Sequence, residues 1–165
     1  MLGRSLASAR VKIGVMFDLS GEPRELLADA RALEAAGADS FWVAPEVDQL
    51  IVLAALAAVT WRPRLIAVAV AVGGALDALE HLAKGRLFQA SASGAELAVA
   101  AGDGEAERWL RAEMPVSKAA WREVRAAREA EGVSGLILPN DPRLLDLLRN
   151  PDVEDDRPDL KLAFG

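Results

Sequence analysis

The sequence predicts an α/β fold: a shortened, incomplete barrel of the TIM type, in which five or six mostly parallel strands are surrounded by helices. Short apolar runs alternate with longer segments of helical periodicity, an order typical of parallel sheets. The run Leu65–Val72 is apolar throughout, as expected of a parallel strand covered on both faces. The chain has 165 residues, whereas a complete eight-stranded barrel needs about 200 to 250. A complete barrel of this type is therefore not expected from one chain.

The first half of the chain predicts four strands joined by three helices. The strands are expected at Val11–Phe17, Ser40–Ala44, Arg64–Val72 and Arg86–Ser91. The helices are expected from Pro23 to Gly37, from Gln49 to Thr60 and from Ala75 to Lys84. Pro23 suits the first turn of its helix, where the missing N–H is not needed, and Gly37 suits the position that ends it.

The second half predicts more helix than strand. A helix is expected over Glu96–Arg111, broken or kinked near Gly102, and an amphipathic helix is expected over Lys118–Glu131. A fifth strand at Val133–Leu138, a short helix at Pro142–Arg149 and a small extra strand at Leu160–Phe164 complete the pattern. The expected organisation is a disordered lead-in over 1–10, one α/β domain over 11–150 and an acidic tail over 151–165.

Composition excludes several classes of function. The net charge of −6, without a basic stripe, argues against nucleic acids and anionic membranes as partners. The chain has no Cys and one His, so neither a disulfide framework nor a thiolate zinc site is available, and no metal site is expected. No secretory signal is evident in residues 1–10, and the longest apolar run, Leu50–Val59, is too short to span a bilayer. A soluble, cytoplasmic protein is therefore expected.

The helix expected at Gln49–Thr60 has almost no polar face. Apolar side chains surround it, at Leu50, Ile51, Val52, Leu53, Leu56 and Val59. A helix that is apolar on all sides must be buried on all sides, and in a small domain a second copy of the chain can supply the missing cover. The sequence therefore predicts a homodimer in which this helix is central.

Several segments together carry a family resemblance. They are Val11–Phe17, Glu22–Leu26, Ala35–Val43, Leu53–Thr60 followed by Arg64 and Leu65, Ala78–Leu82, Gly85–Phe88 and Glu131–Leu138. In this order and spacing they resemble the bacterial luciferase-like flavin oxidoreductases. The resemblance implies a luciferase-like TIM barrel with FMN or a deazaflavin at the C-terminal ends of the strands, and subunits that pair through helices near the front of the chain.

Two function classes follow from the resemblance. The first is an oxidoreductase, such as a monooxygenase, that uses the flavin on an unknown small organic substrate. The alternative is a non-catalytic relative that binds a ligand, or serves as a structural or partner subunit. Ala44–Glu46 favours the alternative, because many members of the family carry a His there, and Ser91–Gly94 has one Gly where the family turn has several. The family's middle strands also have no counterpart.

Candidate site residues follow from the rule that ligands of parallel α/β folds bind beyond the C-terminal ends of the strands. The rule selects seven positions as candidate cofactor-binding residues: Asp18, Glu46, Gly73, Ser91, Ser93, Asn140 and Asp141. The alternative interpretation is that the acidic members cap helices or stabilise turns. No residue is expected to act as a catalytic acid or base, and the single imidazole, His81, lies within a helix, away from the strand ends.

Overall fold

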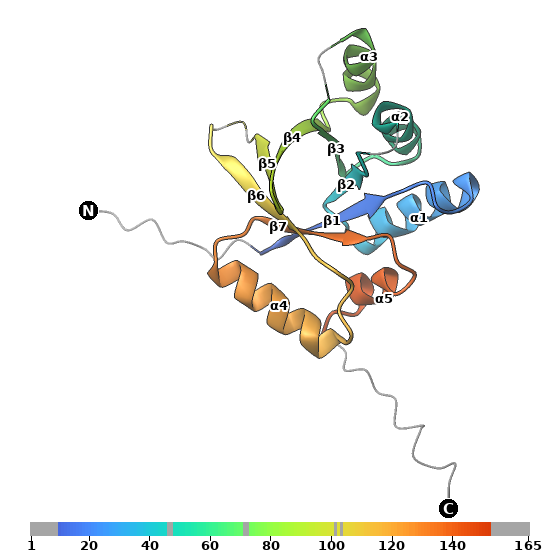
Figure 1. The fold of residues 1–165 in the computed structure, drawn as a ribbon. Coiled ribbons are helices and arrows are strands. Elements are labelled where there is room, and N and C mark those ends of the chain that lie inside the picture. Colours follow the sequence, from blue (N-terminus) through green and yellow to red (C-terminus); the bar gives the residue numbers. More distant parts are fainter. Residues whose placement is uncertain (1–9, 46–47, 71–72, 101, 103, 153–165) are drawn as a thin grey trace, which may run out of the picture.

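Seven strands form one closed barrel, in the order β1-β2-β3-β4-β5-β6-β7 (Figure 1). The computed structural model describes residues 10–45, 48–70, 73–100, 102 and 104–152. The strands are β1 Lys12–Phe17, β2 Ser40–Val43, β3 Arg64–Val68, β4 Leu87–Ser93, β5 Glu96–Ala100, β6 Ala106–Arg111 and β7 Gly135–Pro139. The helices are α1 Pro23–Ala36, α2 Gln49–Val59, α3 Gly74–Ala83, α4 Lys118–Ala130 and α5 Leu144–Arg149. Residues 1–9 of the predicted lead-in, and the predicted strand Leu160–Phe164, lie outside the described residues.

The predicted fold class, a shortened TIM-type barrel, is wrong. The strands from β1 to β4 are parallel, as predicted, but β5 is antiparallel to both β4 and β6. β7 then lies parallel to β6 on one side and to β1 on the other. The barrel is therefore a closed ring of mixed direction, and it leaves no unpaired strand edges of the kind that the predicted open sheet would have.

The error arises from residues 96–111, which were predicted as a helix, whereas 96–100 form β5 and 106–111 form β6. Ala and Glu dominate the segment and favour helix. Its buried residues nevertheless alternate with period two, and Leu97, Val99 and Trp109 belong to one cluster inside the barrel. Gly94 has a φ of +62°, in the left-handed region that a tight turn after β4 requires. Packing inside the barrel therefore overrides local helix propensity.

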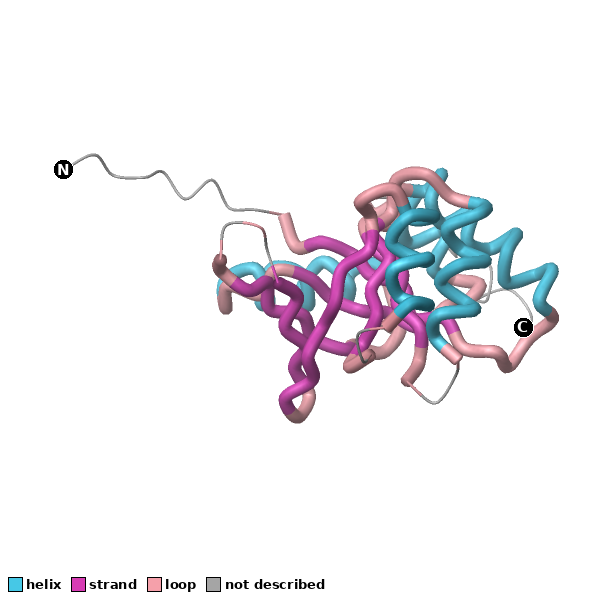
Figure 2. Tube along the Cα trace, turned by 90° about the horizontal axis from the view of Figure 1, so that it is seen from above, coloured by secondary structure: helices cyan, strands magenta, loops and turns pink. Residues whose placement is uncertain are grey.

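Helices cover part of the barrel rather than surrounding it. Figures 1 and 2 show α1, α2 and α3 together on one side of the strands, with β5 and β6 on the opposite side. The outer face of the β4–β6 meander is polar and exposed, at Gln89, Ser91 and Arg108. This face needs no helical cover, which explains why the helices predicted to encircle the barrel are absent from the described part of that side.

The front half of the chain follows the prediction closely. Pro23 begins α1, and Gly37 ends it with a φ of +97°. β3 is shorter than predicted because Ala69, with a φ of +51°, turns the chain out of the strand after Val68. None of the helices in the described ranges is long and apolar enough to cross a membrane. The cytoplasmic location stays a prediction.

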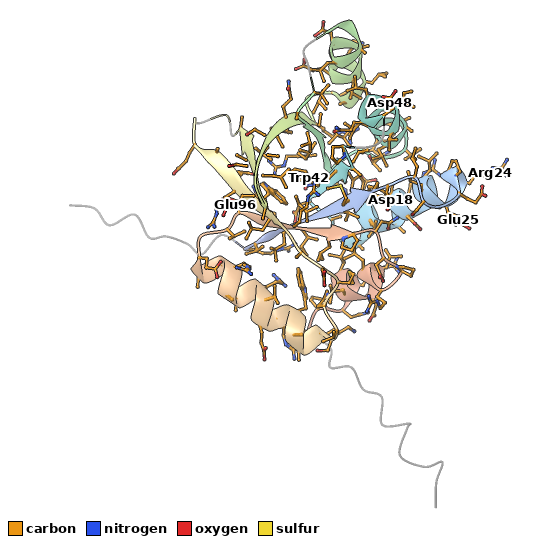
Figure 3. The ribbon with its side chains drawn as sticks, in the orientation of Figure 1. Asp18, Arg24, Glu25, Trp42, Asp48 and Glu96 are labelled. Atoms are coloured by element: carbon orange, nitrogen blue, oxygen red, sulfur yellow. The ribbon has the colours of Figure 1, made fainter. Side chains whose placement is uncertain are left out.

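Side chains fill the interior of the barrel. Trp42 and Trp109 meet at its centre, with ring centroids 5.3 Å apart, and Figure 3 shows Trp42 within the ring of strands. Smaller apolar side chains pack around them: Ile66, Val68, Ala90, Leu97, Val99 and Ile137. Gly14 and Gly135 make room for the two indoles, because a Cβ at either position would lie closer than 3.0 Å to the facing ring.

Candidate functional site

A pocket of about 300 Å³ opens at the end of the barrel where β1, β6 and β7 finish. We call it the barrel-mouth pocket. It is lined by Met16, Arg111, Ala112, Glu113, Met114, Ile137 and Pro139. Since β1, β6 and β7 are parallel, their C-terminal ends meet at the same rim. Parallel α/β folds commonly bind their ligands at this end of the strands.

The barrel core forms the floor of this pocket. Ile137 on β7 belongs to the cluster inside the barrel, and Met16 on β1 packs against that cluster. The segment after β6 forms a wall, because the amide of Ala112 donates a hydrogen bond to the carbonyl of Ile137 at 2.9 Å. Met114, two residues later, packs against a second hydrophobic cluster, which includes Trp121 and Leu136. The pocket therefore has an apolar floor and a wall anchored by the backbone.

Two charged side chains lie at the rim of the barrel-mouth pocket. Arg111, the last residue of β6, and Glu113 are both exposed. Neither side chain forms a hydrogen bond or an ion pair with the residues that the structure describes. The guanidinium of Arg111 thus has free donors next to apolar surface, in the fork geometry that binds carboxylates through two hydrogen bonds.

A second pocket, also of about 300 Å³, lies between the loop after β1, the helix α1 and the segment after β7. We call it the acidic cleft. Its lining includes Asp18, Ser20, Glu22, Glu25, Leu26, Asp29, Leu33, Asn140, Asp141 and Leu145. In Figure 3, Asp18 lies at the end of β1, and Glu25 lies on α1.

Several polar groups of the acidic cleft already have partners within the chain. Ser20 donates its hydroxyl and its backbone N–H to Asp18, and these hydrogen bonds lower the pKa of Asp18. Hydrogen bonds from Arg143 likewise lower the pKa of Asp141. The Asn140 amide donates to Asp29 at 3.0 Å. The contacts of Asp18 and Asp141 are local turn interactions, whereas the hydrogen bond of Asn140 links the segment after β7 to α1. No group of three acidic or His side chains in the described ranges could hold a metal ion.

The structure brings three of the seven predicted site residues together. Asp18, Asn140 and Asp141 line the acidic cleft. Gly73 lies apart from them, immediately before α3. Ser91 and Ser93 are exposed on β4, and Glu46 lies outside the described residues. None of the six described positions lines the barrel-mouth pocket. Their role in binding a cofactor stays a prediction.

Sequence reasoning missed the charged residues of the barrel-mouth pocket because it placed them on or after a helix. The signal that could have found Arg111 is the inward alternation along β6. Glu107, Trp109 and Arg111 occupy every second position, and the first two lie inside the barrel. A strand assignment for this segment would have placed Arg111 at the barrel mouth.

An ion cluster closes the opposite end of the barrel. The Glu107 carboxylate accepts hydrogen bonds from Lys12 at 2.5 Å, from Arg64 at 2.8 Å and from the Trp109 indole at 3.0 Å. Burial alone would raise the pKa of Glu107, but these hydrogen bonds and the charge of Arg64 outweigh burial and lower it to about 2. Arg64 also lies over the ring of Phe88, 5.1 Å from its centroid. We call Lys12, Arg64 and Glu107 the basal ion cluster, and its hydrogen bonds link β1, β3 and β6.

Comparison of the chain with protein-family models, with curated proteins and with solved structures finds no match. The luciferase-like resemblance therefore stays a prediction.

The barrel-mouth pocket does not fit the flavin that the resemblance implies. FMN carries a planar three-ring system and a phosphate chain, whereas about 300 Å³ is the lower limit of ordinary ligand pockets. Trp42 and Trp109 fill the barrel interior beneath the pocket, so the rings could not extend inward. Arg111 is the single cation among the lining residues. The pocket is suited to a smaller ligand.

Proposed function

We propose that the protein binds a small organic anion in the barrel-mouth pocket and acts as a ligand-binding protein rather than as an enzyme. The observation that carries the proposal is a guanidinium with free donors, Arg111, beside an apolar floor of Met16 and Ile137. Such a site recognises a carboxylate by charge and hydrogen bonds, and an apolar body by burial. The lining contains no His, Cys, Ser or Lys to serve as a nucleophile, and Glu113 is its single acidic side chain. This proposal corresponds to the non-catalytic alternative predicted from the sequence.

The flavin-dependent oxidoreductase stays a prediction that rests on the resemblance. Titration of the protein into FMN and into a deazaflavin, followed by cofactor fluorescence, tests it directly. Saturable binding of either cofactor, together with reduction by a nicotinamide donor, would favour an oxidoreductase over the function proposed here.

Substitution of Arg111 tests the proposed site. We expect 4-methylpentanoate, a carboxylate with a branched apolar chain, to bind the wild-type protein saturably in calorimetric titration. Arg111→Gln should weaken this binding about 10- to 100-fold, because a hydrogen-bonded charge pair contributes about 1.5 to 3 kcal/mol. Arg24→Gln is the matched control, since Arg24 is exposed on α1, outside the pocket lining. Equal loss in both variants, or no saturable binding by the wild type, would refute the site.

We also propose that the predicted homodimer forms through the exposed side of α2. Ile51 on this helix is 68% exposed, although the helix has no charged residue over its whole length. Two copies of a chain with a net charge of −6 repel each other, and an uncharged contact face keeps that repulsion small. A second copy of the chain is therefore the partner that suits this face best.

Substitution of Ile51 tests the homodimer. Light scattering coupled to size-exclusion chromatography should report a dimer for the wild type at micromolar concentration and a monomer for Ile51→Arg, because the dimer would bury the introduced charge without a partner. Leu19→Arg is the control, since Leu19 is 55% exposed but lies in the loop after β1. A monomeric wild type would show that the dimer prediction is wrong.

A further inference from the structure

We infer that the barrel-mouth pocket binds a zwitterion, namely an α-amino acid with an apolar side chain. This inference rests on the proposed function and narrows its ligand class. It uses a feature that binding of a simple anion leaves unexplained: the pocket that presents Arg111 also presents a carboxylate, Glu113.

The two charges are of opposite sign and are available to a ligand. Arg111 and Glu113 lie two residues apart and line the same pocket, yet they form no ion pair with each other. Neither has another side-chain partner among the described residues. In a site for a simple carboxylate, Glu113 would repel the ligand and weaken binding. In a site for a zwitterion, it would pair with the ammonium group while Arg111 pairs with the carboxylate.

The remaining lining is apolar and matches a hydrocarbon or thioether side chain. Met16, Met114, Ile137, Pro139 and Ala112 provide it, without a hydrogen-bonding side chain among them. Methionine side chains are flexible and adapt to ligands of different shape, so branched and unbranched side chains both fit this surface. The volume of about 300 Å³ suits a ligand of this size. An amino acid with a polar side chain would lose hydrogen bonds to water on entering the pocket, and the apolar lining would not replace them.

Three ligands that share one apolar skeleton separate the contributions of the two charges. L-Leucine carries both groups, 4-methylpentanoate lacks the amine, and 3-methylbutylamine lacks the carboxylate. In calorimetric titrations of the wild-type protein we expect leucine to bind about 10- to 100-fold more tightly than either analogue, since each charge pair contributes a factor of this size.

Substitution of Glu113 gives the second readout. Glu113→Gln should weaken leucine binding about tenfold or more and leave 4-methylpentanoate binding equal or tighter, because the repulsive charge is removed. Glu123→Gln, which removes an exposed carboxylate on α4, is the matched control and should change neither affinity.

The outcomes distinguish this inference from the proposed function. If 4-methylpentanoate binds the wild type as tightly as leucine, and Glu113→Gln affects both ligands equally, the zwitterion inference is overturned and organic-anion binding stands. If 3-methylbutylamine binds as tightly as leucine, the carboxylate contributes nothing, and both proposals are overturned. The absence of saturable binding by all three ligands would likewise overturn both.

Discussion

Gly135→Ala should lower the free energy of unfolding by about 3 kcal/mol, at the upper end of the usual range for overpacked cores. The Cβ of an alanine here would overlap three carbon atoms of the Trp109 ring. That ring cannot move away freely, because Trp109 is fully buried, packs against Trp42 and donates its indole N–H to Glu107. The strain must therefore be relieved by displacing β6 or β7, whose pairing closes the barrel.

Equilibrium urea unfolding, followed by tryptophan fluorescence and by far-ultraviolet circular dichroism, measures this effect. Gly21→Ala is the matched control, because nothing lies within 4 Å of the Cβ it would add. It should leave the midpoint almost unchanged. A Gly135→Ala protein as stable as the wild type would mean that the interior is more loosely packed than the structure shows.

Glu107→Gln is expected to lower the free energy of unfolding by about 2 to 3 kcal/mol at neutral pH. The substitution keeps the size of the side chain but removes the negative charge that pairs with Lys12 and Arg64. The cost stays below that of a fully buried pair, because the Lys12 side chain is 42% exposed and can be solvated. Lys84→Gln is the control, since Lys84 is an exposed residue at the end of α3 that has no carboxylate partner in the described ranges.

The pH dependence of this difference follows from the pKa of Glu107. Its pKa is about 2 in the folded protein, below the ordinary value of 4.5, so the carboxylate stabilises the fold fully above about pH 4.5. That stabilisation is lost as the pH falls from 4.5 towards 2. Urea unfolding at a series of pH values should therefore show the difference in stability between the wild type and Glu107→Gln narrowing below about pH 4.5 and closing near pH 2. If the difference in unfolding free energy stayed constant across the series, the charge of Glu107 would not be the cause of the lower stability of Glu107→Gln.

The parallel front of the barrel could be predicted because its signals are local. Pro23 and Gly37 mark the ends of α1, and the continuous apolar run from Leu65 marks a strand covered on both faces. The segment 96–111 could not be assigned in the same way, because its Ala-rich composition favours helix and the evidence for strands is long-range. The segment forms a meander because Leu97, Val99 and Trp109 fill the space beside Trp42. Trp42 lies on β2, which is distant from this segment in the sequence.

The candidate site was predictable to the extent that it depends on parallel strand ends. That rule selected the end of the barrel at which the barrel-mouth pocket opens, and three of the selected residues line the neighbouring acidic cleft. Their role in binding stays a prediction. The rule could not indicate Arg111, the last residue of β6, or Glu113, two residues beyond it, because β6 was predicted as part of a helix. The basal ion cluster was also missed, because Lys12, Arg64 and Glu107 are far apart in the sequence and meet only once the barrel has closed.

The position of β7 between β1 and β6 has a consequence for synthesis of the chain. The ribosome makes β1 first, yet the neighbour that pairs with Ile13 is Leu136 on the seventh strand. Until β7 emerges, the nascent protein can form at most a six-stranded sheet whose first and last strands, β1 and β6, expose unpaired backbone groups. Such edges are where other chains attach. Protection against misassembly during translation therefore depends on the prompt arrival of one five-residue strand, Gly135–Pro139.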